Sequence, residues 1–136
     1  MPHVIRLRGP WEFELADAEQ VLRGEISVPT LWSAFVPADY AGRITLLRRF
    51  GRPTGLEQSP RVSLAVDSLN LPGVVFLNGD RLGEFGNSPG PVHVRWEVMS
   101  RLLPRNELRL EFSELPRGPL LESTSPPNVW LEIEAG

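Results

Sequence analysis

Hydrophobic and polar residues alternate along most of the chain. In five segments about every second residue is apolar and most residues between are polar or charged: 11–15, 62–67, 92–98, 107–112 and 129–134. Successive side chains of a β-strand point to opposite faces, so each segment predicts a strand with one buried and one solvated face. Strands of this kind are typical of antiparallel sheets, and two such sheets pack into a sandwich. The pattern therefore predicts an all-β antiparallel β-sandwich of about nine strands.

Two further segments depart from the alternation. Residues 74–77 are apolar at every position, which predicts a central strand covered on both faces. The segment 44–50 places Arg48 on the apolar face of its strand. An arginine there should pair with an acid, extend its guanidinium group to solvent, or line a ligand cleft.

Turn-forming residues separate the predicted strands. Of the 136 residues, 14 are Pro and 12 are Gly, which leaves little room for long helices. Asn78-Gly79 follows the apolar strand and predicts a tight hairpin, because both central residues of such a turn need a positive φ. Short helical turns are expected within 16–24 and 99–103. No repeat, linker or shift in composition divides the chain, so residues 1–136 are predicted to form a single domain.

Composition excludes several kinds of chemistry. The chain has no Cys, which rules out disulfides, thiolate zinc sites and Cys nucleophiles. All 14 basic residues are Arg, so Schiff-base chemistry and a phosphate-loop lysine are ruled out too. With 17 acidic residues and a net charge of −3, no nucleic-acid partner is expected. The sequence also lacks an apolar run that could span a membrane and a signal-peptide pattern, so we expect a cytoplasmic protein unless a leader has been removed.

Motifs for catalysis are weak. Residues 86–90 match the G-x-S-x-G pattern of a nucleophile elbow, but a Pro follows the Ser and a strand-like pattern follows the second Gly. His3 and His93 have no metal-ligand spacing, and His93 lies on the polar face of its strand. The Glu residues occupy mainly the solvated positions of the strands, which explains them better than a pair of glycosidase carboxylates. We therefore expect no catalytic residue and no metal ligand.

A few aromatic and polar side chains are candidates for ligand binding. An exposed aromatic ring can stack on the C–H face of a sugar, while Arg, Asn and Glu bind its hydroxyl groups. The candidates are the aromatic residues that do not belong clearly to an apolar face, together with the buried-face arginine and the turn asparagine: Trp32, Tyr40, Trp130, Arg48 and Asn78. Each has a structural alternative, namely core packing or loop anchoring for the aromatic residues and a turn role for the asparagine. If Trp130 were exposed on an edge strand, it would favour self-association, so a homo-oligomer stays open.

Several of these residues occur in an order known from one enzyme family. The series consists of short elements spread along the chain: Trp11; Val28, Pro29 and Trp32; Tyr40, Gly42, Arg48 or Arg49 and Phe50; Asn78, Gly79 and Gly83; Leu103, Asn106 and Leu108. In this series the chain resembles the N-terminal sugar-binding domain of glycoside hydrolase family 2, the β-galactosidase and β-glucuronidase group. The resemblance covers nearly the whole chain and implies a galactose-binding-like jelly-roll sandwich. The sequence departs from the family pattern at 86–90, which lacks an aromatic residue, and at 97–100, which replaces an Asp-Ile-Thr element.

The resemblance implies binding without catalysis. The family's catalytic glutamates belong to a separate barrel domain, so the expected function is that of a non-catalytic carbohydrate-binding module. The alternatives are a protein-interaction or scaffold domain that has lost sugar binding, and a split piece of a glycosidase. The expected partner is thus a carbohydrate or another protein domain, and no cofactor is expected. Related sandwiches often hold a structural calcium, which would need oxygens from Asp17, Asp39, Asp67 or Asp80.

Overall fold

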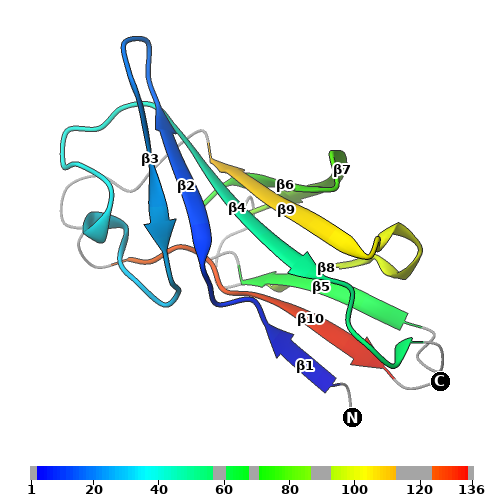
Figure 1. Ribbon diagram of the computed structural model, residues 1–136. Coiled ribbons are helices and arrows are strands. Elements are labelled where there is room, and N and C mark those ends of the chain that lie inside the picture. Colours follow the sequence, from blue (N-terminus) through cyan, green and yellow to red (C-terminus); the bar gives the residue numbers. More distant parts are fainter. Residues whose placement is uncertain (1–2, 57–60, 68–70, 87–92, 113–123, 135–136) are drawn as a thin grey trace.

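The computed structural model describes residues 3–56, 61–67, 71–86, 93–112 and 124–134, which form two antiparallel β-sheets (Figure 1). The smaller sheet has four strands in the order β1 (His3–Arg6), β10 (Val129–Glu134), β5 (Arg61–Asp67) and β8 (His93–Glu97). The larger sheet has six strands in the order β3 (Val21–Ile26), β2 (Trp11–Ala16), β4 (Arg43–Gly51), β9 (Arg105–Phe112), β6 (Gly73–Leu77) and β7 (Asp80–Phe85). The predicted all-β antiparallel sandwich is confirmed, with ten strands among the described residues.

Two short 3₁₀ turns are the helical elements that lie wholly within the described residues. They are η1 (Trp32–Ala34) and η3 (Met99–Arg101), and the second confirms the turn expected within 99–103. Neither turn is long and apolar enough to cross a membrane. The helical turn expected within 16–24 is wrong, because β2 and β3 form a hairpin there. The Asp17 carboxylate closes this hairpin by accepting the backbone N–H groups of Glu19 and Gln20, both at 2.8 Å.

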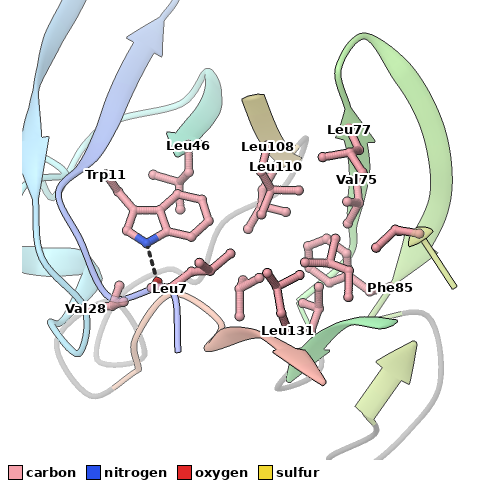
Figure 2. Close-up of a cluster of buried hydrophobic side chains, with 14 of the residues drawn as sticks. Leu7, Trp11, Val28, Leu46, Val75, Leu77, Phe85, Leu108, Leu110 and Leu131 are labelled. Carbon is pink, nitrogen blue, oxygen red and sulfur yellow. Dashed lines mark hydrogen bonds between the residues drawn. The ribbon is translucent and has the colours of Figure 1, made fainter. Parts of the chain in front are cut away.

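The hydrophobic core lies between the two sheets and takes alternate residues from their strands (Figure 2). Trp11 is buried near one edge of this layer, and its indole N–H donates to the Leu7 carbonyl at 2.8 Å. Leu108 and Leu110 of β9 contribute from the six-stranded sheet, and Leu131 of β10 contributes from the four-stranded sheet. The alternation read from the sequence therefore identifies the inner face of each of these strands.

The hairpin at Asn78-Gly79 joins β6 to β7 as predicted. Its two central residues have φ values of 53° and 87°, the left-handed conformation that this turn requires. The side chain of Asn78 also links the turn to β9, because its Oδ1 accepts the backbone N–H of Glu107 at 2.8 Å. The turn thus fixes one end of the six-stranded sheet.

Two expectations about strand environment are corrected by the sheet order. Strand β6 is not covered on both faces, because Val74 and Phe76 are only half-buried on the outer face of the six-stranded sheet. The guanidinium group of Arg109 lies 4.5 Å from the Phe76 ring centroid and covers part of that ring. Trp130 does not lie on an edge strand, since β10 pairs with β1 on one side and β5 on the other. The edge-strand argument for self-association therefore does not apply to it.

Candidate functional site

Trp32, the first of the five predicted site residues, lies in the hydrophobic core. It is 0% exposed and begins the turn η1. Its ring lies 5.2 Å from the ring of Phe112 in an edge-to-face arrangement and 5.7 Å from that of Phe35, measured between centroids. A sugar could stack on this indole only if the indole left the core, so its position fits the packing alternative.

Tyr40 anchors the segment before β4. Its hydroxyl group lies 2.9 Å from the Ala16 carbonyl and 2.5 Å from the Arg43 carbonyl, and its single proton can be donated to either. Burial raises the pKa of the Tyr40 phenol above its ordinary value of 10.0. A Cβ atom on Gly42 would come within 2.5 Å of the phenol oxygen, so the close packing requires glycine. These contacts hold the ends of β2 and β4 together.

Arg48 and Asn78 meet at one depression of about 490 Å³ at the end of the six-stranded sheet. The Nη1 group of Arg48 donates to the Arg49 carbonyl, while its Nε is buried without a hydrogen-bond partner among the described residues. Burial lowers the pKa of this guanidinium group. Both amide atoms of Asn78 are engaged at the turn, because Oδ1 accepts the backbone N–H of Glu107 and Nδ2 donates to Asn106 Oδ1 at 3.0 Å. Of the two residues, only Arg48 has a polar side-chain atom without a hydrogen-bond partner among the described residues, and that atom is buried.

Trp130 differs from the other aromatic candidates, because it lies on the outer face of the four-stranded sheet. Its indole N–H donates to Oε1 of Glu132 at 2.9 Å. Arg95 Nε lies 3.1 Å from both oxygens of the same carboxylate. The His93 ring lies 5.1 Å from the indole, measured between centroids, at an angle of 82°. We refer to Trp130, Glu132, Arg95 and His93 as the Trp130 cluster.

The Trp130 cluster spans three strands. Its members come from β10 and β8, which lie on either side of β5 and do not pair with each other. Their side chains therefore meet above β5, whose outward residues at this level are the small Ser63 and Ala65. Ala65 lies between Trp130 and Arg95 in the register and is 0% exposed although it points outward. Small residues on β5 thus leave room for long side chains from both neighbouring strands.

Glu132 is the electrostatic centre of this cluster. Its side chain is 15% exposed, whereas that of Arg95 is 49% exposed. The hydrogen bond from Arg95, followed by that from Trp130, holds the pKa of the Glu132 carboxyl below its ordinary value of 4.5, against the opposing effect of burial. The group is therefore ionised at neutral pH. Asp67 lies opposite His93 in the register and has a buried Oδ1 with no hydrogen-bond partner in the described part of the chain.

The outer face of the six-stranded sheet is a second polar surface. Two adjoining depressions of about 610 and 570 Å³ lie on it and share Glu14, Thr45 and Glu111. Most charged side chains there form ion pairs with one another: Arg23–Glu14 at 3.1 Å, Arg49–Glu12 at 2.6 Å and Arg109–Glu111 at 3.5 Å. Neither lining contains a Trp or Tyr residue. The aromatic side chains in these linings are Phe13 and Phe112, and Phe112 is buried.

The residues considered for a structural calcium are not gathered at one place in the described part of the chain. Asp17, Asp39, Asp67 and Asp80 lie on separate turns or strand ends. No group of three or more His, Asp or Glu side chains suited to a metal occurs among the described residues. The G-x-S-x-G match at 86–90 lies outside the described residues from position 87 onward.

Comparison with known proteins identifies the fold. No protein-family model and no curated protein matches the chain. A β-glucuronidase from Ruminococcus gnavus, in complex with uronic isofagomine, is similar over 98% of this chain and 29% of its own, with a TM-score of 0.71 and 18% identity. An FMN-binding β-glucuronidase from Facaelibacterium prausnitzii L2-6 matches over 96% of this chain and 22% of its own, with a TM-score of 0.69 and 19% identity.

The chain has the fold of a β-glucuronidase domain. A further match, the β-glucuronidase of an uncultured Clostridium sp., has a TM-score of 0.68 at 17% identity over 98% of this chain and 29% of its own. The chain therefore spans less than a third of the length of these enzymes, and the matched part is consistent with a domain of the glycoside hydrolase family 2 type. At such identities the likeness concerns the fold, and function must be argued from the site.

Proposed function

We propose that this chain is a non-catalytic carbohydrate-binding domain of the kind found in family 2 glycoside hydrolases. The observation that carries the proposal is the fold match, which covers nearly all of this chain and only a minor part of each enzyme. The Trp130 cluster adds support, since it places an indole ring beside charged groups on an outer sheet face. An aromatic ring flanked by hydrogen-bonding groups is a suitable surface for a sugar.

The carboxylates of the described strands support a binding role more than a catalytic one. Glu132 is held by Arg95 and an indole N–H, and its pKa is lowered. A general acid needs the opposite, a raised pKa near the working pH. Glu12 and Glu14 on the other sheet are also engaged by arginines. These groups are suited to holding side chains in place.

The proposal is tested by titrating the full chain with simple glycosides and following its amide resonances by NMR. Suitable probes are methyl β-galactoside, methyl β-glucoside, methyl β-glucuronide and soluble plant oligosaccharides. Binding at an open surface should be weak, in the micromolar to millimolar range, because few apolar atoms are buried. Saturable shifts with at least one probe are expected. If no probe shifts any resonance at the highest attainable concentration, carbohydrate binding is refuted.

A second candidate function is docking to another protein domain. It is favoured by the fold match itself, because in each β-glucuronidase the matched part is accompanied by a much longer remainder of the chain. A domain of this kind can serve as a scaffold that has lost sugar binding, or as a separated piece of a glycosidase. A mass that rises with protein concentration, or a partner that co-purifies at fixed stoichiometry, would support docking.

A further inference from the structure

We propose that carbohydrate binds on the outer face of the four-stranded sheet, where a pyranose ring stacks on the solvent-facing side of the Trp130 indole. This inference rests on the proposed carbohydrate-binding function and adds the place and the ligand class. Of the five candidates that the sequence offers it keeps Trp130, since Trp32 is buried and Tyr40 and Asn78 have structural partners. Among these five candidates, Trp130 alone combines an aromatic ring, an outer face and neighbouring polar groups.

The first step is the orientation of the indole. Neighbouring strands lie about 4.8 Å apart, so β10 and β8 are separated by about twice that distance across β5. The Trp130 ring nevertheless lies 5.1 Å from the ring of His93 on β8. The two rings therefore meet above β5, where the outward-facing Ala65 has no exposed surface. Trp130 is half-buried in this position, so part of its ring is open to solvent.

The second step is that the indole is held in place before any ligand arrives. Its N–H group is bound by Glu132, and Glu132 is bound in turn by Arg95. Hydrogen bonds to an ionised carboxylate are stronger than neutral ones, and the lowered pKa of Glu132 keeps this one ionised. A side chain that is already ordered loses little conformational entropy when a ligand stacks on it. Glu132 and Arg95 are thus positioning residues for the stacking surface.

The third step is the presence of polar groups beside the ring. Arg6 of β1 is directly opposite Trp130 in the register, is exposed, and has no ion-pair partner among the described residues. His93 is exposed on the other side of the indole. Both side chains can donate hydrogen bonds to the ring oxygen or hydroxyl groups of a sugar. A stacking face with donors on two sides fits a single pyranose unit.

The chemistry of stacking selects the ligand class. Contact with an indole requires a sugar face that carries only axial C–H groups. A β-glucoside presents such a face on both sides, because its substituents are all equatorial, and a β-galactoside presents one. Methyl α-mannoside carries an axial oxygen on each side of the ring, so neither of its faces is free. We therefore expect β-linked glucosides and galactosides to bind and methyl α-mannoside to bind at least several-fold more weakly.

The experiment is a titration of the full chain with methyl β-glucoside, methyl β-galactoside and methyl α-mannoside, followed by NMR. The Trp130 indole N–H resonance, assigned by its loss in Trp130→Phe, should shift together with the backbone amides of Ala65 and Arg95. The amide of Thr45, on the outer face of the other sheet, should not shift. Trp130→Ala should raise the dissociation constant about tenfold. Val21→Ala, which trims an exposed apolar side chain on β3, should leave it unchanged.

The outcomes separate this inference from the function on which it rests. If the β-glycosides bind but their shifts map to the six-stranded sheet, the Trp130 surface is wrong while carbohydrate binding stands. The same holds if Trp130→Ala folds and binds with an unchanged dissociation constant, or if methyl α-mannoside binds as well as methyl β-glucoside. If none of these three glycosides binds, this inference fails. The proposed function fails as well only if methyl β-glucuronide and the plant oligosaccharides also leave every resonance unshifted. Should Trp130→Ala not fold, the shift map of the unaltered chain and the exposed-site variant Arg6→Gln decide the question.

Discussion

Asn106 is the most informative single residue for the stability of this fold. It is the one buried polar residue of the described core, 3% exposed, and its amide makes four hydrogen bonds. Its Oδ1 accepts from Leu103 N at 2.9 Å and from Asn78 Nδ2 at 3.0 Å, and its Nδ2 donates to the carbonyls of Leu103 at 2.9 Å and Phe50 at 3.4 Å. These bonds connect β9 to β4, to the hairpin turn and to the segment after η3. Replacing Asn106 should therefore loosen three connections at once.

The variant Asn106→Leu removes the hydrogen bonds and keeps a side chain of similar size. Three of the four bonds are short, and each contributes about 1 kcal/mol net. The free energy of unfolding should therefore fall by about 3 kcal/mol. For a domain of this size that is a large part of the total stability.

Urea unfolding followed by Trp fluorescence measures this change, with Arg105→Gln as the control. Arg105 is exposed and adjacent to Asn106, so its substitution should alter the free energy of unfolding by no more than about 0.5 kcal/mol. A loss below about 1 kcal/mol in Asn106→Leu, at an unchanged dependence on urea concentration, would show that the amide network does not hold this end of the sandwich.

Further predictions concern other contacts in the structure. The pKa of Glu132 is lower in the folded chain than its ordinary 4.5, so its contribution to stability is present above that pH and is lost as the pH falls through the lowered value. Between pH 6 and pH 3, the free energy of unfolding should fall by about 1 kcal/mol more in the unaltered chain than in Glu132→Gln. Urea unfolding at the two pH values measures this, and equal losses in the two proteins would contradict the Arg95–Glu132 contact. Gly42→Ala should destabilise the chain by about 1–3 kcal/mol, because the added carbon would lie 2.5 Å from the Tyr40 hydroxyl and 2.6 Å from the Ala16 carbonyl. An unchanged melting temperature in that variant would refute the close packing of Tyr40.

Local pattern carries enough information to predict the sheets and the hairpin. The face that a residue takes on its strand depends on its position along the chain, so the buried Leu108 and Leu110 follow from alternation alone. The Asn78-Gly79 turn follows from its need for positive φ. The environment of β6 and β10 does not follow, because the order of strands in a sheet is set by pairing between distant segments. The apolar side chain of Phe76 suggests a covered position, but the sequence pattern does not show that its sheet face lacks a covering layer.

The candidate site depends on distant pairing to a greater degree. Trp32 lies in an irregular stretch where no alternation assigns a face, and its burial comes from packing on Phe112, far away in the sequence. Alternation predicts solvated side chains at the polar positions of β8 and β10. These side chains do point outward, but Glu132 is largely covered by its neighbours. Arg95 and Glu132 are 37 residues apart and meet because β5 lies between their strands with Ser63 and Ala65 outward. The small outward residues of β5 are the signal in the sequence that points to this cluster. They can be interpreted only when β8 and β10 are known to be the neighbours of β5.

The most direct test of carbohydrate binding at the Trp130 cluster is the response of the Trp130 indole N–H resonance when methyl β-glucoside is added to the full chain. We expect a saturable shift of this resonance, with the indole resonances of the buried Trp11 and Trp32 unmoved. A spectrum in which the Trp130 resonance stays in place, with this sugar and with methyl β-galactoside alike, would contradict binding at the Trp130 cluster.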